Sequence, residues 1–246
     1  MSRPVMFLHG GNVGGWIWEP QVAALGDRPT LAPNLPGYRS RRAQPWTSFD
    51  AVADRLVAMI DEDVGEPVDL VGLSLGGITA LHLAARHPDR VASVFVSGAS
   101  ALPYPWPMRA VNRVAIALWN RRFYWMGTAR QFGLRGPEAE EFLADTPPIT
   151  RENLLAQLSE VYPGRLLALD RITAPLMAVA GEKEMGYFFG SIRAIRAAVP
   201  AAQAGLAPGM HHAWNGEDPD LFNRILRTWL DERTAHPDLL PFPAAR

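Results

Sequence analysis

Short apolar runs alternate with helical patterns along most of this chain, and this alternation restricts the fold more than any other feature. Runs that predict buried strands lie at residues 5–8, 30–32, 68–71, 91–96, 176–180 and 203–207. Patterns with helical spacing lie at residues 51–60, 78–87 and 191–199, and a closing amphipathic helix is expected at 222–230. Strands that alternate with such helices form parallel βαβ units, whose sheet is covered on both faces. We therefore predict an α/β fold with a mostly parallel central sheet of about six strands and helices on both faces.

The alternation stops after residue 100 and resumes near residue 170. The segment between them is rich in tryptophan, proline and arginine and contains helical stretches but no clear strand. We predict an α/β core made of residues 1–100 and 170–246, interrupted by a helical cap insertion at 101–169. The proline-rich end, with Pro237, Pro241 and Pro243, is expected to be a loose tail.

Composition narrows the classes of site and partner. The 246 residues include no cysteine, which excludes disulfides, thiolate metal sites and cysteine nucleophiles. A formal net charge of −1 does not favour nucleic acid or an anionic membrane. No apolar stretch reaches the roughly 18 residues of a spanning helix, and the N-terminal residues do not resemble a signal peptide. We expect a cytoplasmic protein that acts on a small molecule without metal or cofactor; its oligomeric state stays open.

The segment from Gly72 to Gly77, with the sequence GLSLGG, lies directly after the expected strand 68–71 and before a helix. A serine on a tight strand-to-helix turn is held in a strained backbone conformation that exposes its hydroxyl. Glycines at positions 72 and 76 let the two sides of such a turn come together. The N-terminus of the following helix adds a positive partial charge where an oxyanion would form. This context predicts that Ser74 is a nucleophile.

A serine nucleophile needs a base, and histidine has a suitable pKa range for that role. The chain has six histidines. Two of them, His211 and His212, follow the last expected strand and precede the closing helix, which is a suitable position. His9 follows the first strand and begins the sequence His9-Gly10-Gly11, where a structural role is expected.

Taken together, His9-Gly10-Gly11, the turn at Ser74 and the late histidine resemble the α/β-hydrolase fold family in order and spacing. The segment from His212 to Phe222 resembles that family's histidine loop, in which a glutamate and a proline follow the catalytic histidine. The resemblance spans residues 4 to about 230 and implies that His212, not His211, is the base. It specifies the fold far better than the substrate.

The same resemblance implies the remaining catalytic groups. The family places its acid in a Gly-x-x-Asp pattern, and here Gly181-Glu-Lys-Glu184 puts Glu184 on that position. Glutamate can orient the imidazole and stabilise the imidazolium as aspartate does. An alternative acid position after an earlier strand falls at 97–100, where there is no carboxylate. The oxyanion hole is expected from the N–H groups of Gly11 and Leu75, with Asn12 as an additional donor.

The expected cap carries many aromatic residues, which predicts an apolar and aromatic wall for the pocket. The predicted substrate-binding residues are Asn12 and, from the cap, Trp106, Trp119, Tyr124 and Trp125. The other aromatic residues of the segment are Phe123, Phe132 and Tyr162. Four arginines in the same segment are interpreted as a solvated helix face rather than as an anion site: Arg109, Arg113, Arg121 and Arg122.

These features together predict a serine hydrolase that cleaves an ester, thioester or lactone of a small hydrophobic or aromatic substrate through an acyl-enzyme on Ser74. Serine at position 74 argues against dehalogenase and epoxide hydrolase chemistry, which uses aspartate in this fold. Gly10 and Ala213 stand where the family's hydroxynitrile lyases carry threonine and lysine. Two alternatives remain open: a carbon–carbon bond hydrolase of the same fold, and a hydrolase-fold protein that binds a small molecule without turnover.

Overall fold

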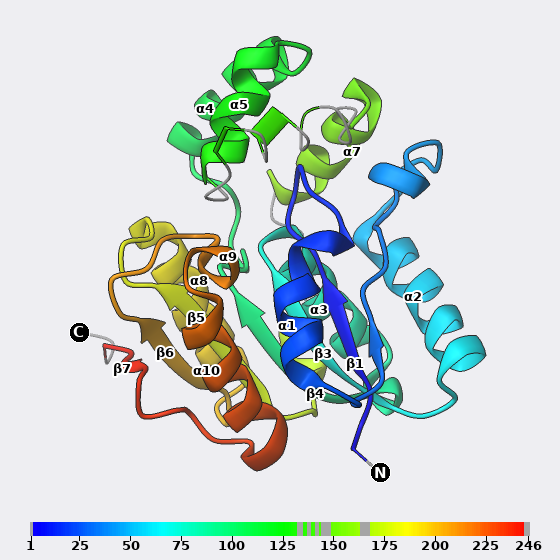
Figure 1. Cartoon of the computed structure of the whole chain (residues 1–246), viewed down its shortest axis with the longest axis vertical. Coiled ribbons are helices and arrows are strands. Elements are labelled where there is room, and N and C mark those ends of the chain that lie inside the picture. Colours follow the sequence, from blue (N-terminus) through cyan, green and yellow to red (C-terminus); the bar gives the residue numbers. More distant parts are fainter. Residues whose placement is uncertain are drawn as a thin grey trace.

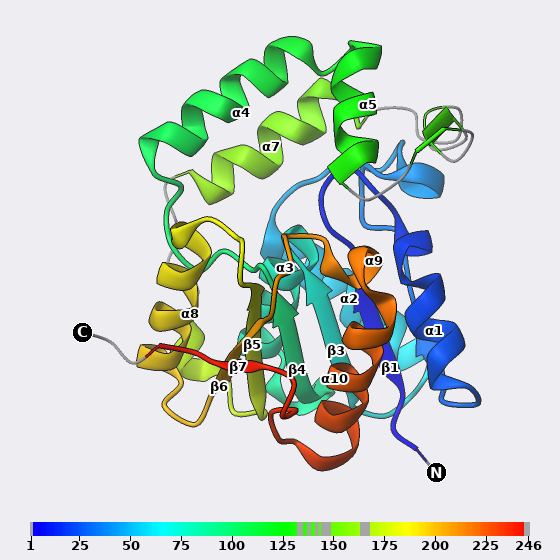
Figure 2. The ribbon, with the colours of Figure 1, turned by 60° about the vertical axis from the view of Figure 1, so that its left-hand side comes forward.

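A seven-stranded sheet in the order β2-β1-β3-β4-β5-β6-β7 forms the centre of the computed structural model (Figures 1 and 2). The structure describes residues 2–131, 135–136, 139–140, 143, 149–162 and 168–243. The strands are β1 (Val5–Leu8), β2 (Thr30–Leu31), β3 (Val68–Leu73), β4 (Val91–Ser97), β5 (Leu176–Gly181), β6 (Gln203–Ala207) and β7 (Leu240–Pro241). The first six pair in parallel, which confirms the predicted class of sheet.

The seventh strand differs from the expected loose tail. β7 pairs antiparallel with β6, with Leu240 opposite Leu206. The flanking side chains of Leu239 and Phe242 are buried, so apolar contacts hold this short segment at the sheet edge. Pro241 is tolerated because an edge strand does not need every backbone N–H for pairing.

Helices cover both faces of the sheet, as predicted. Helices α1 and α10 lie on one face, and α2 and α3 lie on the other (Figures 1 and 2). The helices that flank the sheet are α1 (Glu19–Leu25), α2 (Phe49–Asp63), α3 (Leu75–Arg86), α8 (Gly186–Ala198), α9 (Trp214–Glu217) and α10 (Pro219–Glu232).

Local capping explains where these helices begin. Ser48 accepts a hydrogen bond from the N–H of Ala51 and caps α2. Asp218 accepts from the N–H of Leu221 and caps α10, whose first residue is a proline that needs no hydrogen-bond partner. Helix α3 begins at Leu75, three residues before the sequence pattern predicts; the Ser74 side chain makes no capping hydrogen bond there, but the Ser74 carbonyl accepts from the N–H of Ile78 at 3.0 Å.

A cluster of aromatic side chains packs between the sheet and the α1–α10 layer. Phe222 of α10 contacts the rings of Trp214 and Trp18, with centroids 4.4 and 5.6 Å apart. Trp18 is fully buried and lies against Phe7 of β1. This cluster joins the first and last parts of the chain. Because Trp214 follows His212 by two residues, the cluster also fixes one end of the loop that carries His212.

Between β4 and β5, helices α4 (Trp106–Leu118), α5 (Arg122–Gln131) and α7 (Arg151–Val161) lie above the ends of the parallel strands (Figures 1 and 2). Helix α7 is joined to the core by polar contacts from one of its faces. Asn153 accepts from the N–H of Trp46 at 2.7 Å, and Glu160 accepts from the Trp46 indole at 2.9 Å and from the N–H of Phe49 at 3.0 Å.

Candidate active site

Ser74 occupies the sharp turn between β3 and α3. Its backbone angles are φ 53° and ψ −113°, a conformation that costs a non-glycine residue about 1–3 kcal/mol. The Ser74 N–H donates to the carbonyl of Ser97 in β4 at 2.9 Å, and the Ser74 carbonyl accepts from Ile78 at 3.0 Å. Hydrogen bonds on both sides of the residue therefore maintain the strained turn.

The glycines of this turn are required by close backbone contacts. A Cβ atom on Gly72 would lie 2.5 Å from the carbonyl oxygen of Gly76. A Cβ atom on Gly76 would lie 2.0 Å from the carbonyl oxygen of Leu8 in β1. Both distances are too short for any side chain, so the spacing of glycines around Ser74 follows from the packing of β3, α3 and β1.

His212 and Glu184 lie side by side, although they come from different loops. Glu184 follows β5, and His212 follows β6, the neighbouring strand. One Glu184 oxygen is 3.1 Å from His212 Nδ1, and the other accepts from the N–H of Gly181 at 3.2 Å. The Glu184 side chain is only 1% exposed, whereas that of His212 is 38% exposed. The buried carboxylate can thus orient an imidazole whose other nitrogen remains available.

The neighbouring histidine has a different partner. Glu217 accepts from the backbone N–H of His211 at 2.8 Å and is also 2.8 Å from His211 Nδ1. This pair is largely exposed to solvent. Because Glu217 holds His211 and Glu184 holds His212, the two histidines are oriented independently.

The loop after β1 is supported by His9. Its Nε2 accepts from the N–H of Leu35 at 2.9 Å, and its Nδ1 donates to the carbonyl of Gly10 at 2.7 Å. Burial lowers the pKa of His9 to about 4; the hydrogen bond to Gly10 opposes this shift, and the nearby Arg39 charge adds to it. His9 is therefore neutral near pH 7, and it fixes the position of the following glycines.

Tyr38 and Tyr124 complete the support of this loop. Asn12 has a positive φ of 68°; its backbone hydrogen-bonds the Tyr38 hydroxyl, and its side chain hydrogen-bonds that of Tyr124. Burial raises the pKa of both tyrosines, so both stay neutral phenols. Tyr38 in turn donates to Gln157 Oε1 of α7 at 2.9 Å.

A cavity of about 250 Å³ brings most of these residues together. Its floor includes Ser74, Leu75 and His212, and one side is formed by Gly10, Gly11 and Asn12. The opposing helices contribute Asn112 from α4, Tyr124 from α5, and Leu154, Gln157, Leu158 and Val161 from α7. Tyr38, Leu73, Ile78 and Tyr104 complete the lining.

Only some of the predicted substrate-binding residues line the cavity. Asn12 and Tyr124 line this cavity. Trp106 is 78% exposed on the outer side of α4. Trp119 lies in the turn before α5, where its carbonyl accepts from the indole of Trp125 at 2.6 Å. Among the described residues, none of the three tryptophans lines the cavity, and Phe132 lies outside the described residues.

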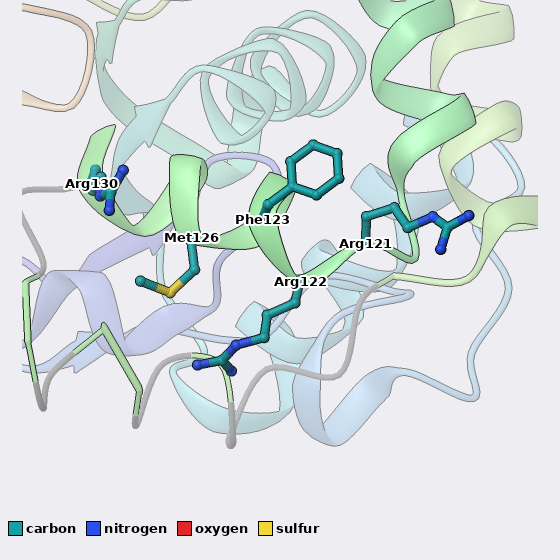
Figure 3. A pocket seen from close by; sticks show the side chains of 5 residues that line it. All are labelled: Arg121, Arg122, Phe123, Met126 and Arg130. Atoms are coloured by element: carbon teal, nitrogen blue, oxygen red, sulfur yellow. The ribbon is translucent and has the colours of Figure 1, made fainter.

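Two of the predicted surface arginines border a second, wide hollow of about 790 Å³ along α5. Arg121, Arg122 and Arg130 surround Phe123 and Met126 there, and the arginine side chains point in different directions (Figure 3). Arg122 forms an exposed ion pair with Glu140 at 2.6 Å. The described lining of this hollow contains no acid, base or nucleophile that is suited to hydrolysis.

Tyr38, Gln157 and Gly98 are among the residues around the site that the sequence predictions do not include. Tyr38 and Gln157 line the cavity and connect α7 with the Asn12 loop. Gly98 lies directly against the His212 ring, so that a Cβ atom there would be 2.6 Å from His212 Cε1. The position of Tyr38 in the loop after a parallel strand is the available signal for a functional role. Neither Gln157 nor Gly98 stands in a pattern that predicts its contact.

Within the described part of the chain, no group of three or more histidine, aspartate or glutamate side chains is placed to hold a metal ion. The helices of that same part include none with the length and apolar character needed to cross a membrane.

Comparison with known proteins identifies a family. Residues 5–225 match the model of the alpha/beta hydrolase family. The chain is 43% identical over 91 residues to lipase LipV of Mycobacterium tuberculosis, a match that covers 37% of this chain and 34% of the relative. It is 34% identical over 110 residues to 2-hydroxymuconate semialdehyde hydrolase of a Pseudomonas species, which covers 42% and 38% of the two chains. The matches thus span little more than a third of these relatives.

The likeness of structure extends over nearly the whole chain. A thermophilic esterase from Thermogutta terrifontis superimposes with a TM-score of 0.76 and 21% sequence identity, covering 94% of this chain and 90% of the esterase. At this level of identity the superposition is evidence for a shared fold.

Proposed function

The chain belongs to the α/β-hydrolase family, and on that basis we propose that it is a serine hydrolase that cleaves an ester of a small hydrophobic or aromatic substrate. Thioesters and lactones are related substrates because they react through the same tetrahedral intermediate. The relative named as a lipase supports this class of reaction.

In the proposed reaction, the Ser74 hydroxyl attacks the substrate carbonyl while His212 takes the hydroxyl proton. Glu184 holds the imidazole and stabilises its protonated form. The N–H groups of Gly11 and Leu75 donate to the oxyanion, with Asn12 beside them. The intermediate collapses to an acyl-enzyme as His212 gives its proton to the leaving alcohol. Water, deprotonated by His212, then releases the acid and restores Ser74.

One observation carries this proposal: the strained Ser74 at the start of α3 shares a cavity with His212, whose Nδ1 is 3.1 Å from the buried Glu184 carboxylate. A merely structural glycine-rich turn requires neither the imidazole in the same cavity nor a buried acid behind it. His9 is fully buried with both ring nitrogens already hydrogen-bonded, and the His211–Glu217 pair is exposed, so both are poorer candidates for the base.

We further propose that residues 101–169 act as a cap over this site. The cavity walls that α4, α5 and α7 contribute are mostly apolar, with Tyr124 as an aromatic member. Such a wall favours a small hydrophobic or aromatic group on the substrate. Trp119 and Trp125 support Tyr124 from behind in this interpretation, since the Trp125 ring packs edge-on against Tyr124 at 5.3 Å.

Labelling with a fluorophosphonate probe tests the assignment. We expect stoichiometric labelling of Ser74, no labelling in Ser74→Ala, and labelling slowed on the order of 100-fold or more in His212→Ala. His211→Ala serves as the matched control and should label at nearly the normal rate. An inert Ser74 in a folded protein that binds small molecules tightly would instead support a protein without turnover.

Carbon–carbon bond hydrolysis is the second candidate. It is favoured by the similarity to a hydrolase of 2-hydroxymuconate semialdehyde, a compound whose name contains no ester. Comparing the turnover of this compound with that of 4-nitrophenyl butyrate distinguishes the two candidate reactions. If kcat/KM is higher for the semialdehyde, the protein is a carbon–carbon bond hydrolase rather than an esterase. Both reactions should be lost in Ser74→Ala.

A further inference from the structure

Gln157 is the polar side chain of α7 that enters the catalytic cavity. It is only 5% exposed and lines the same space as Ser74 and His212. Its neighbours on this helix face, Asn153 and Glu160, bind the segment that contains Trp46 and Phe49. These contacts on either side of Gln157 hold its backbone in place, so its amide is preorganised.

The orientation of this amide follows from its partner. Tyr38 is buried and remains protonated, and its hydroxyl already hydrogen-bonds the backbone of Asn12. The Asn12 bond lowers the pKa of Tyr38, as an N–H that donates to the phenol oxygen does, so the Tyr38 proton is free to be donated to Gln157 Oε1, at 2.9 Å. With Oε1 occupied in this way, Nε2 is the end of the amide that needs an acceptor. Within the described residues, Nε2 has no hydrogen-bond partner.

A buried N–H donor without an acceptor is unfavourable, and proteins seldom keep one without a reason. The other residues of α7 that line the cavity cannot accept this hydrogen bond through their side chains, because Leu154, Leu158 and Val161 are apolar. A ligand in this cavity that supplied an oxygen acceptor would satisfy Nε2. Purely apolar ligands would leave it unsatisfied.

We infer that Gln157 is a specificity-determining residue that donates its Nε2–H to a second oxygen acceptor of the substrate, apart from the carbonyl that Ser74 attacks. The substrate class is then an ester that also carries a ketone, ether or carboxyl oxygen, rather than a simple alkyl ester. This inference rests on the proposed function, because it takes Ser74 as the place of bond cleavage.

Matched ester pairs test this inference. Each 4-nitrophenyl oxoalkanoate, with its ketone at carbon 4, 5 or 6, is compared with the alkanoate of equal chain length. A parallel series places the ketone in the alcohol part of an acetate ester. After correction for hydroxide-catalysed hydrolysis, at least one pair should show a kcat/KM preference for the oxo ester of about tenfold. In Gln157→Met this ratio should fall to about one.

Asn153→Leu is the matched control. It removes another α7 hydrogen bond to the core, and Asn153 is not among the described residues that line the cavity. The preference should persist in Asn153→Leu, because Glu160 still holds α7 to the core and Tyr38 still donates to Gln157 Oε1. A purely structural role for Gln157 would make the two substitutions equivalent. The inference is overturned if no pair shows a preference in the wild-type protein, or if Gln157→Met keeps it.

The outcomes separate this inference from the proposed function. If alkanoate esters are hydrolysed and Ser74→Ala abolishes that activity, the hydrolase assignment stands whatever the ratio is. If no ester is turned over, calorimetric binding of the free oxo acids and alkanoic acids still tests Gln157. Tighter binding of an oxo acid to the wild-type protein, lost in Gln157→Met, supports the donor role, and equal binding refutes it.

Discussion

Gly98 offers a sensitive test of the active-site geometry, because an added methyl group there would press against the His212 ring. Gly98 follows β4 with a φ of 56°, and its N–H donates to the carbonyl of Val179 at 3.0 Å. In Gly98→Ala the new Cβ would lie 2.6 Å from His212 Cε1, 2.7 Å from Nδ1 and 3.1 Å from a Glu184 oxygen. The substitution therefore acts on the histidine and its acid together.

Two separate effects determine the size of the change. Ordinary contacts begin at 3.4 Å, so the imidazole must move by about 0.8 Å to accommodate the methyl group. A displacement near 1 Å can lower turnover by about 100-fold, and we expect a loss of this order in kcat. The positive φ adds strain of about 1–2 kcal/mol to the folded state, independently of the contact.

Gly65→Ala is the control for the strain. Gly65 also has a positive φ, 76°, but no atom lies within 4 Å of the place that its Cβ would take. Both variants should lose stability in urea unfolding through the positive φ, with a further loss in Gly98→Ala from the close contact, whereas only Gly98→Ala should lose turnover of 4-nitrophenyl butyrate. If the kcat of Gly98→Ala stays within about twofold of that of Gly65→Ala, the close packing of Gly98 against a catalytic histidine is refuted.

Three further predictions concern the titratable groups. His9 has its ordinary pKa of 6.5 in the unfolded chain and a pKa of about 4 in the folded chain. The free energy of unfolding that this difference contributes is fully present above pH 6.5 and falls by about 3 kcal/mol as the pH is lowered to 4. Urea unfolding from pH 7 to pH 4 should show this loss, and His9→Asn should lack it; parallel profiles would contradict the assignment. Glu184→Gln should lower kcat on the order of 1,000-fold with an unchanged circular dichroism spectrum, and near-normal kcat would mean that another group orients His212. Glu217→Gln should change kcat less than about threefold, because Glu217 binds His211; a loss as large as that of Glu184→Gln would reverse the choice of histidine.

The sequence pattern predicts the parallel sheet because buried strands in such a sheet are continuously apolar and are separated by amphipathic helices. β1, β3, β4 and β5 each consist of buried residues or nearly so. The short edge strand β7 has no such pattern: its two residues are exposed, and its position depends on the buried neighbours Leu239 and Phe242. Contacts with the distant strand β6, rather than local preference, therefore determine that element.

The same distinction applies to the site. The strand-to-helix turn at Ser74 can be predicted from the sequence because the glycines that permit it are local. Gly98 cannot, because its importance arises from His212, which reaches it through a different loop. The Tyr38–Gln157 hydrogen bond joins residues separated by 119 positions. A polar side chain such as Gln157 on a helix is typical of a solvated face, and only the tertiary structure places it in a cavity.

The formation of an acyl-enzyme on Ser74 tests the central claim most directly. The protein is mixed with 4-nitrophenyl butyrate, quenched in acid within the first turnover, and digested for peptide mass spectrometry. We predict a butyryl group on the peptide that contains Ser74, and its absence from Ser74→Ala treated identically. Ester turnover that proceeds at the normal rate in Ser74→Ala, or an acyl group found only on another residue, would contradict the account.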